Sequence, residues 1–399
     1  MPETRPVPLP YRRERSWPFA PAAELVRLRS EEPLSRIPMP IPADPDLRVW
    51  LATRYSDVRG IMADPRFSNA PGPDEPRTRT RSATPPSLLG VDPPEHTRLR
   101  RPLTREFTVR GVNAMRTRIE EIVADRLAAM ERAGPPADLL RDFALPVPVL
   151  VICELLGVPY RDRGDFRRRS DTLLDHSLGQ EERARAAEET AAYMRALVQR
   201  HRADPGPELL GRLVREHGAV LTDADLVGLG SLLLVGGHET TANMLALGTL
   251  LLLRSPDQLA VVRDDPDAVA PAVEELLRYL SIVHFGVIRR ATEDVTVAGR
   301  LVRAGELVVC SLPSANRDRD LLPDQPDRLD VTRRPVPHVA FGHGVHQCVG
   351  QQLARAELRI ALPALLRRFP DLRLDVPFER IRYRDHALVY GVVSLPVRW

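Results

Sequence analysis

The residue best suited to chemistry is Cys348, which lies in a glycine-rich segment near the C-terminus, residues 341–350. Glycines at this spacing let the backbone adopt tight or left-handed conformations, so that amide N–H groups can point at the sulfur. The segment that follows, residues 351–369, has apolar residues at helical spacing and predicts a helix. Because a helix N-terminus stabilises a thiolate relative to a thiol, the pattern predicts that Cys348 is a metal ligand.

Three other interpretations of Cys348 compete with an iron ligand. A free cysteine can be a small buried hydrophobic residue, although glycines and histidines are not typical neighbours in a core. A zinc site could combine Cys348 with His338, His343 and His346, but zinc sites usually have paired CxxC or HxxxH spacings, and neither occurs. A cysteine protease would need a histidine base, and no known nucleophile signature surrounds this cysteine.

A polar cluster interrupts a long apolar segment between Thr222 and Arg254. Thr222, with an acidic residue three positions later, predicts the start of a helix, and the Ser-Pro pair after Arg254 predicts its end, about 45 Å away. Residues 238–243 are polar at the point where a lipid-facing helix should be driest, so we expect a buried helix rather than a membrane span. Gly236 and Gly237 each weaken it by about 1 kcal/mol relative to alanine, which predicts a local widening where a ligand approaches the backbone.

The pattern Phe-Gly-x-Gly-x-His-x-Cys-x-Gly at residues 341–350 resembles that of the cytochrome P450 haem-thiolate monooxygenases, in their bacterial, actinobacterial-type class. This resemblance implies that Cys348 is the axial ligand of a haem b iron, where its thiolate favours cleavage of the O–O bond. It also implies that His346 is a partner of a haem propionate.

Residues 236–241 resemble the oxygen-activation motif of the same family. The resemblance implies that Thr240 hydrogen-bonds the oxygen being activated and that Glu239 helps to relay protons to it. Cleavage of the O–O bond needs two protons in a pocket that otherwise excludes water. The alternative is that Thr240 bonds back to a helix carbonyl and that Glu239 pairs with a distant arginine.

Two further segments resemble parts of the family's haem surroundings. Glu275 and Arg278, three residues apart on a predicted helix, are implied to have a structural role together with Arg317. A segment containing His96 and Arg100 resembles the one that binds the haem propionates, and only one of Arg289 and its neighbour Arg290 should reach the haem. The implied cofactor-binding residues are His96, Arg100, Gly236, Arg289, Phe341, Gly342, His346 and Gly350.

The resemblance also implies a substrate pocket, and its predicted residues are apolar enough to indicate a large hydrophobic ligand. Residues 68–86 and 172–180 would form mobile portions of a lid over this pocket. The predicted lining is Leu232, Val235, Gly236, Phe285, Val287 and Val389.

Composition restricts the partners and the location of the protein. The 57 basic residues, all of them arginine, nearly balance 54 acidic residues, and the net charge of +3 gives no reason to expect nucleic-acid binding. Residues 1–20 contain prolines and arginines but no apolar run, so we expect neither a signal peptide nor a membrane anchor. Three cysteines, two of them in apolar surroundings, indicate a reduced, cytoplasmic protein, which we expect to be a monomer.

The expected fold is mostly α with small β-sheets, which is also the architecture of the cytochrome P450 family. We expect one domain over residues 1–399, with the haem between the long central helix and the cysteine turn. The predicted elements are a strand at 46–52, helices at 56–63, 119–130 and 181–202, and a β-hairpin within 294–310.

The implied activity is the insertion of one atom of dioxygen into a hydrophobic small molecule, by hydroxylation or epoxidation. A secondary metabolite such as a polyketide or macrolide is the expected substrate. Electrons must come from a ferredoxin and its reductase, because the chain lacks a G-x-G-x-x-G turn on a strand and an iron–sulfur cysteine cluster. Arg355, Arg359 and Arg367 would offer positive charge for docking. The alternative is a non-catalytic haem protein, such as a gas sensor or carrier, which would not need Glu239 and Thr240.

Overall fold

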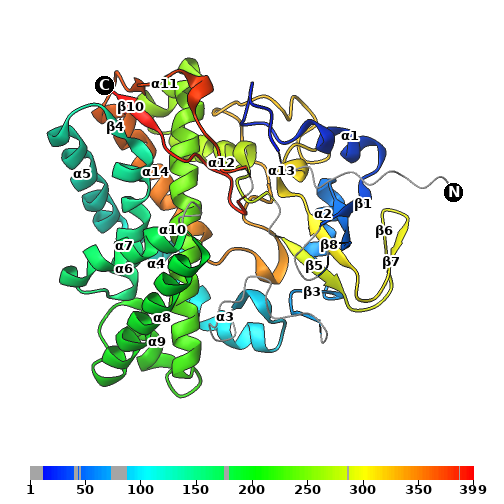
Figure 1. The fold of residues 1–399 in the computed structure, drawn as a ribbon, viewed down its shortest axis with the longest axis horizontal. Coiled ribbons are helices and arrows are strands. Elements are labelled where there is room, and N and C mark those ends of the chain that lie inside the picture. The colour runs from blue at the N-terminus through cyan, green and yellow to red at the C-terminus, as the bar shows by residue number, and fades with distance from the viewer. Residues whose placement is uncertain are drawn as a thin grey trace. The chain divides into compact units, whose positions relative to one another are not determined.

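The computed structural model describes residues 12–39, 44, 46–72, 88–174, 179–284, 287–385 and 387–399. It is mostly helical with small β-sheets, as the sequence predicts (Figure 1). The described chain forms two compact units, each assembled from three segments, and each unit is described by itself. The first unit contains Met1–Pro73, Arg254–Cys348 and Arg382–Gly391, and the second contains Asp74–Leu253, Val349–Ile381 and Val392–Trp399. The expectation of a single domain over 1–399 stays a prediction.

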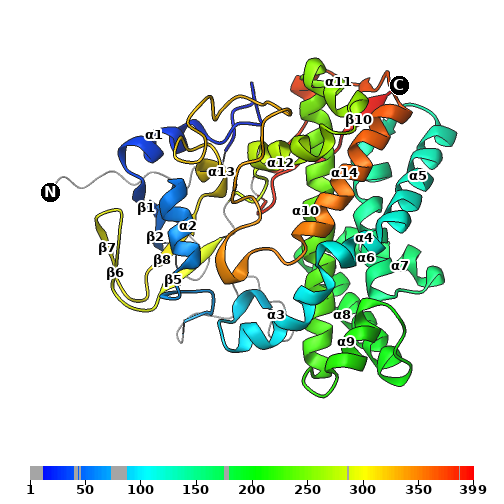
Figure 2. The same ribbon diagram turned by 180° about the vertical axis from the view of Figure 1, so that it is seen from behind.

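A long central helix, α10, organises the second unit. It runs from Asp223 to Leu253, and α6, α8 and α14 pack against it. Figure 2 shows α14 alongside α10, with α5 beyond it. The other elements of this unit include a three-stranded sheet in the order β4-β10-β9. The bounds are α3 Glu95–Glu106, α4 Val109–Ala114, α5 Arg116–Ala133, β4 Ala137–Asp138, α6 Pro146–Leu156, α7 Arg163–Leu174, α8 Gln180–Ala203, α9 Leu209–His217, α14 Gln351–Arg368, β9 Arg373–Leu374 and β10 Pro396–Arg398.

The N-terminus of α10 is a capping box, as predicted. The amide of Asp225 donates to Thr222 Oγ1 at 3.1 Å, and the amide of Thr222 donates to Asp225 Oδ2 at 2.9 Å. Such reciprocal bonds satisfy amide groups that the first helical turn leaves unpaired.

The predicted widening of α10 is wrong, because the helix stays α-helical through both glycines. A Cβ atom on Gly237 would lie 2.8 Å from Ile152 Cδ1, so this glycine allows α6 to approach α10 closely. The described residues contain no single helix long and apolar enough to cross a membrane. Only α10 and α11 together meet that test, with a bend of 118° between them.

The first unit is built on a five-stranded sheet in the order β1-β2-β8-β5-β3. Strands β2 and β8 pair in parallel, with Leu51 opposite Val309, and the other pairs are antiparallel. Alternate residues of β2 enter two apolar clusters, since Trp50 packs with residues of α2 and Leu51 packs with residues of α1. The bounds are α1 Ala23–Glu31, β1 Leu34–Pro38, β2 Arg48–Ala52, α2 Tyr55–Ala63, β3 Phe67–Ser68, α11 Pro256–Asp264, α12 Val269–Leu280, β5 Ile288–Ala291, β8 Leu307–Cys310 and α13 Leu312–Ala315.

The predicted strand, helices and hairpin are confirmed as β2, α2, α5, α8 and the hairpin of β6 (Val295–Val297) and β7 (Arg300–Val302). Ala298 and Gly299 close this hairpin with positive φ angles of 48° and 75°. Residues 73–86 of the first predicted lid segment and 175–178 of the second lie outside the described residues, whereas residues 172–174 form the end of α7.

A buried ion pair joins α12 to the irregular chain that follows α13. Arg278 donates to both carboxylate oxygens of Glu275, at 2.7 and 2.8 Å, and to the carbonyls of Asn316 and Pro326, each at 2.8 Å. The side chains of Arg278 and Glu275 are 0% and 3% exposed. Arg333 reaches the same carboxylate at 3.4 Å. A buried pair of this kind is costly to break, because the remaining charge has no water to solvate it.

We expect Glu275→Gln to lower the free energy of unfolding by about 3–5 kcal/mol, because it leaves the Arg278 charge uncompensated. Urea unfolding followed by circular dichroism measures this loss. The matched control is Glu24→Gln, since Glu24 forms the same i,i+3 pair with Arg27 on an exposed face of α1 and should lose at most about 1 kcal/mol. Equal losses in the two variants would contradict the prediction.

Glu357 is a second buried acid, on α14, and it differs from Glu275 in its surroundings. Its side chain is almost fully buried, and Oε2 has no hydrogen-bond partner among the described residues. Burial raises the pKa of this carboxyl well above its usual range. The folded protein therefore holds a proton on Glu357 that the unfolded chain releases at lower pH.

This proton makes the stability depend on pH in a defined direction. The free energy of unfolding should fall as the pH rises above the unfolded carboxyl pKa, about 4.3, towards the raised folded value. Glu357→Gln should flatten that dependence and be more stable than the native protein at pH 8, measured by urea unfolding between pH 5 and pH 9. The exposed Glu216→Gln is the control and should leave the slope unchanged. A native-like slope in Glu357→Gln would refute this assignment.

Candidate functional site

Two glycines with left-handed backbone shape the turn that carries Cys348. Gly342 and Gly344 both have φ of 73°, a conformation that side chains disfavour. A Cβ on Gly344 would lie 2.3 Å from the carbonyl oxygen of Met62 on α2, so this position has no room for a side chain. The amide of Cys348 donates to the carbonyl of Phe341 at 2.9 Å and closes the turn.

The position of Cys348 in the chain agrees with its predicted chemistry. It lies two residues before Gly350, the N-cap of α14, which confirms the predicted helix start. The side chain of Cys348 is exposed, whereas Cys153 and Cys310 are buried. Burial raises the thiol pKa of each of these two to about 12, so neither forms a thiolate at neutral pH. Of the three cysteines, Cys348 alone is accessible to a ligand.

The histidines near Cys348 do not converge on a zinc site. His338 lies 3.2 Å from a carboxylate oxygen of Glu274, and His343 accepts a hydrogen bond from Arg59 Nε at 3.2 Å. Within the described ranges, no group of three His, Cys, Asp or Glu side chains could hold a metal ion. A haem needs only one protein ligand here, because the porphyrin supplies four nitrogens. The donor set therefore fits a haem and does not fit zinc.

Asn316 anchors the chain that leads to the cysteine segment; it belongs to the stretch 315–318 that the family resemblance identified as the partner of Glu275 and Arg278, although only Arg317 was named there as a site residue. Its Oδ1 accepts a hydrogen bond from the amide of Val339 at 2.7 Å, and its Nδ2 donates to Ser281 Oγ at 2.8 Å, just after α12. Arg317, the predicted structural residue, instead donates to the carbonyl of Tyr279 at 2.9 Å and stacks 3.6 Å from the centre of that ring. The asparagine next to a predicted structural arginine was the available signal.

One stripe along the middle of α10 is partly exposed on a helix that is otherwise mainly buried. Leu232, Val235, Gly236, Glu239 and Thr240 form it, at positions i, i+3, i+4, i+7 and i+8 of one helical face. Apolar residues occupy its first part, and an acid and a hydroxyl end it. The structure thus brings together the predicted catalytic residues and the α10 part of the predicted substrate pocket.

Thr240 bonds back to its own helix, as the alternative interpretation of the sequence foresaw. Its Oγ1 donates to the carbonyl of Gly236 at 2.6 Å, and Asn243 Nδ2 likewise donates to the carbonyl of Glu239 at 2.8 Å. A hydroxyl that donates to a carbonyl still has lone pairs that can accept a hydrogen bond. This contact is therefore compatible with a catalytic role for Thr240.

His238 lies outside the exposed stripe. Its side chain is fully buried, and burial lowers its pKa to about 4, while the charge of Glu239 and a hydrogen bond with the backbone of Leu145 act in the opposite direction. His238 is therefore neutral near pH 7 and belongs to the interior of the second unit.

The predicted propionate partners lie in both units. His96 and Arg100 are both on α3, four residues apart. Burial lowers the pKa of His96, and the nearby positive charge of Arg100 lowers it further. His346 lies in the 3₁₀ turn Gly344–His346 of the first unit, two residues before Cys348. Arg289 is buried on β5, and the adjacent Arg290 bonds to the carbonyl of Gly305 at 3.2 Å, so the two arginines have different surroundings.

The remaining predicted pocket residues differ in their burial. Val389 is 4% exposed and forms a β-bridge with Val283, so it packs in the interior of the first unit, whereas its neighbour Leu388 is 44% exposed. Val287 is half-buried and packs on the sheet core. Phe285 lies outside the described residues.

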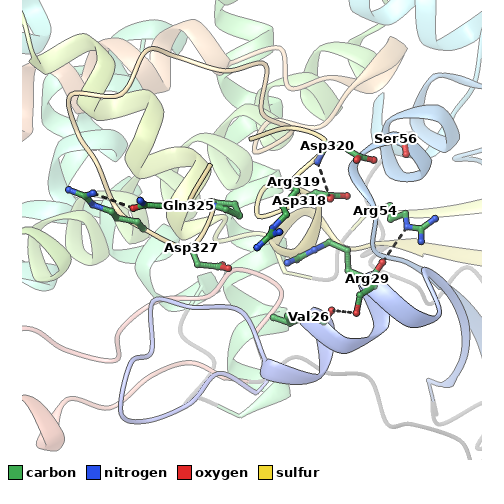
Figure 3. Close-up of a pocket in the computed structure, with 12 residues that line it drawn as sticks. Val26, Arg29, Arg54, Ser56, Asp318, Arg319, Asp320, Gln325 and Asp327 are labelled. Carbon is green, nitrogen blue, oxygen red and sulfur yellow. Dashed lines mark hydrogen bonds between the residues drawn. The ribbon is translucent and has the colours of Figure 1, made fainter. Parts of the chain in front are cut away.

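A pocket of about 910 Å³ in the first unit has the wrong chemistry for a hydrophobic ligand (Figure 3). Asp318 is engaged there, because one carboxylate oxygen accepts the amide of Tyr55 at 2.8 Å and the other accepts the amide of Asp320 at 3.2 Å. The charged residues that line this pocket are Arg29, Arg54, Asp318, Arg319, Asp320, Asp327 and Arg328.

Comparisons with known proteins agree with the geometry of the site. The sequence model of the Cytochrome P450 family matches residues 178–389. Cytochrome P450-SU2 of Streptomyces griseolus is 47% identical over 98% of this chain and 96% of its own length. Nocardicin C N-oxygenase of Nocardia uniformis subsp. tsuyamanensis is 46% identical over 96% of this chain and 98% of its own.

Solved structures give the same result. The crystal structure of a CYP105P1 mutant superposes with a TM-score of 0.92 and 40% identity, covering 99% of this chain and 100% of that one. The exposed cysteine before a helix, the stripe on α10 and the full-length similarity to these proteins lead to one conclusion. The chain belongs to the cytochrome P450 family and is a haem-dependent monooxygenase.

Proposed function

We propose that this enzyme hydroxylates or epoxidises a hydrophobic secondary metabolite at a haem b, with electrons supplied by a ferredoxin and its reductase. The observation that carries the proposal is the exposed stripe on α10, where apolar Leu232 and Val235 lead to Glu239 and Thr240. An apolar surface next to one acid and one hydroxyl suits a hydrophobic substrate that is held beside a source of protons.

Cys348 is the residue that would hold the haem iron through its sulfur in this proposal. The haem, when bound, supplies the reductive activation of dioxygen. The chain contributes a thiolate that the adjacent N-terminus of α14, capped by Gly350, stabilises. The left-handed backbone of Gly342 and Gly344 shapes the turn that presents it. Phe341 closes this turn through its carbonyl group, which the amide of Cys348 contacts.

Thr240 and Glu239 are the proposed proton-transfer residues. Thr240 Oγ1 donates to the carbonyl of Gly236 at 2.6 Å, so the lone pairs of this oxygen would accept a hydrogen bond from a protonated group beside the helix. Glu239, one residue earlier and partly exposed, can exchange protons with solvent and pass them on. Haem propionates are anions, and in apolar surroundings they need cationic or N–H partners. The proposed partners are His96, Arg100, Arg289 and His346.

The substrate class and the electron source are the finer parts of the proposal. The similarity to nocardicin C N-oxygenase supports a secondary metabolite, and the apolar residues of the stripe support a polyketide- or macrolide-sized hydrophobic molecule. Arg359 and Arg367 are exposed on α14, and Arg355 is half-buried, which supports docking of an acidic ferredoxin. Three cysteines, none of them in a disulfide, support a reducing, cytoplasmic location. A gas sensor or carrier would not need the acid and hydroxyl on α10.

Cys348→Ser tests the proposed ligand, because it removes the thiolate while changing one atom. The native protein, reduced and exposed to carbon monoxide, should show the red-shifted Soret band of a thiolate-ligated haem, and the variant should lose it. The buried Cys310→Ser is the matched control and should keep the band. A native spectrum in Cys348→Ser would assign the ligand elsewhere.

Thr240→Ala tests the proposed proton transfer. We expect the rate of product formation to fall by about 10²-fold and hydrogen peroxide to rise, because a positioned group that takes part in proton transfer contributes about that much to the rate. Product and peroxide are measured together in a reconstituted assay. Thr249→Ala is the control, since Thr249 also lies on α10 and donates to the carbonyl four residues earlier, at 2.8 Å, but is buried. Unchanged coupling in Thr240→Ala would remove Thr240 from the mechanism.

A further inference from the structure

We propose that Arg98 is a positioning residue for the haem, because it clamps α3 to the start of α10 and so sets where α3 presents His96 and Arg100. The inference rests on the proposed function, in which those two residues bind the haem propionates. The hydrogen-bond partners of Arg98 are Glu95, Val220 and Asp225, and none of these is a proposed cofactor-binding residue. Arg98 therefore acts on the haem through α3.

The clamp is a bidentate ion pair between Arg98 and Asp225. Arg98 Nη1 donates to Asp225 Oδ2 at 2.9 Å, and Nη2 donates to Oδ1 at 3.0 Å. The same guanidinium donates to the carbonyl of Val220 at 3.0 Å and to both oxygens of Glu95, at 2.8 and 2.6 Å. A planar guanidinium with this many partners restricts both the distance and the angle between the segments that it joins.

Asp225 is a rigid anchor for this clamp. Its side chain is 5% exposed, and the same carboxylate accepts the amide of Thr222 in the capping box of α10. Burial acts to raise the pKa of Asp225, but the hydrogen bonds from Arg98 and Thr222 outweigh it, and the net pKa lies below the usual range. The anchor is therefore ionised at neutral pH and fixed to the first turn of the longest helix.

The spacing along α3 explains why this contact matters for the other face of the helix. His96 and Arg100 are four residues apart, which places them within about 40° of each other around the axis. Arg98 lies two residues from each, which is about 160–200° around the same axis. A bond that holds Arg98 on one side of α3 therefore fixes the rotation of the side that carries His96 and Arg100.

A second ion pair holds the opposite end of α3 and provides a matched comparison. Arg212 on α9 donates to Glu106, the last residue of α3, at 2.8 Å. Both pairs attach α3 to neighbouring helices of the same unit, but only the Arg98 pair lies between His96 and Arg100. A purely structural role would make the two pairs equivalent, whereas a positioning role makes them different.

The charges around Arg98 also separate positioning from direct anion binding. Two carboxylates, from Glu95 and Asp225, already face its guanidinium. An additional propionate would have to compete with both of them, so Arg98 is poorly placed to bind the haem itself. Outer partners that orient a ligand-binding group typically change affinity about 10- to 100-fold when they are removed.

The experiment compares haem loss in Arg98→Gln, Asp225→Asn and the double variant with Arg212→Gln as the control and Arg100→Gln as the reference. The rate of haem transfer to excess apomyoglobin and the reduction potential are measured for each holoprotein, together with the unfolding temperature after haem removal. We expect haem loss about tenfold faster in Arg98→Gln and in Asp225→Asn, with no further increase in the double variant. Arg212→Gln should change it by less than about threefold.

The inference is overturned if Arg98→Gln loses haem no faster than Arg212→Gln while Arg100→Gln loses it faster than the native protein. Native-like haem loss in Arg100→Gln would instead remove the proposed propionate role of α3, and the inference with it. Should Arg98→Gln fail to fold, Arg98→Lys is measured in its place, because lysine keeps the positive charge but cannot form the bidentate contact with Asp225. Faster haem loss at an unchanged unfolding temperature supports positioning, and a native rate overturns it.

Discussion

The buried pair of Glu275 and Arg278 is the interaction on which the first unit depends. A guanidinium that is fully buried must have each of its donors satisfied, and here the carbonyls of Asn316 and Pro326 complete what the Glu275 carboxylate begins. Between α13 and Cys348 the chain has little regular structure, so it cannot satisfy its backbone groups by itself. The ion pair therefore holds in place a segment that neither helix nor sheet would hold, and through Asn316 it reaches the amide of Val339, nine residues before the cysteine.

The second unit solves a different problem, which is how to keep a partly exposed stripe that ends in two polar side chains on a helix that organises an apolar core. The α10 helix buries most of its side chains, and Gly237 lets α6 pack against it without the gap that a side chain would need. Close packing on that side makes the helix rigid, so a few residues on another side can remain partly exposed without destabilising it. Thr240 and Asn243 both bond to carbonyls of the preceding turn, which gives these polar side chains partners within the helix itself.

Local patterns in the sequence predicted much of this structure. The capping pair Thr222 and Asp225 and the turn before Gln351 were correctly read, because each depends on residues close together in the chain. The parallel pairing of β2 with β8 was not predicted, since strands more than 250 residues apart leave no joint signal in hydrophobic periodicity. The Arg98–Asp225 contact was not predicted either, because its two residues are also far apart in the sequence. The predicted widening of α10 was wrong because glycines weaken an isolated helix, whereas this helix is held by tertiary packing, with α6 lying close to Gly237. Residue types and spacing predicted Cys348 as a metal ligand, whereas its proposed haem and the proposed roles of Thr240 and Glu239 came from family resemblance.

The absence of lysine from this sequence has a structural counterpart in these contacts. Arg278 and Arg98 each bind a carboxylate through two nitrogens and use the remaining donors on backbone carbonyls, which a lysine ammonium could not match in geometry. Arg13 is also buried, donates to the carbonyls of Leu280 and Ser281, and lies 4.2 Å from the centre of the Tyr390 ring. Burial lowers the pKa of Arg13 only to about 10, so it stays charged at neutral pH. A lysine begins from a lower pKa and would lose its proton more readily under the same desolvation. Arginine therefore lets this fold keep fixed positive charges at buried positions such as Arg13 and Arg278, where they bind the carbonyl groups of irregular segments.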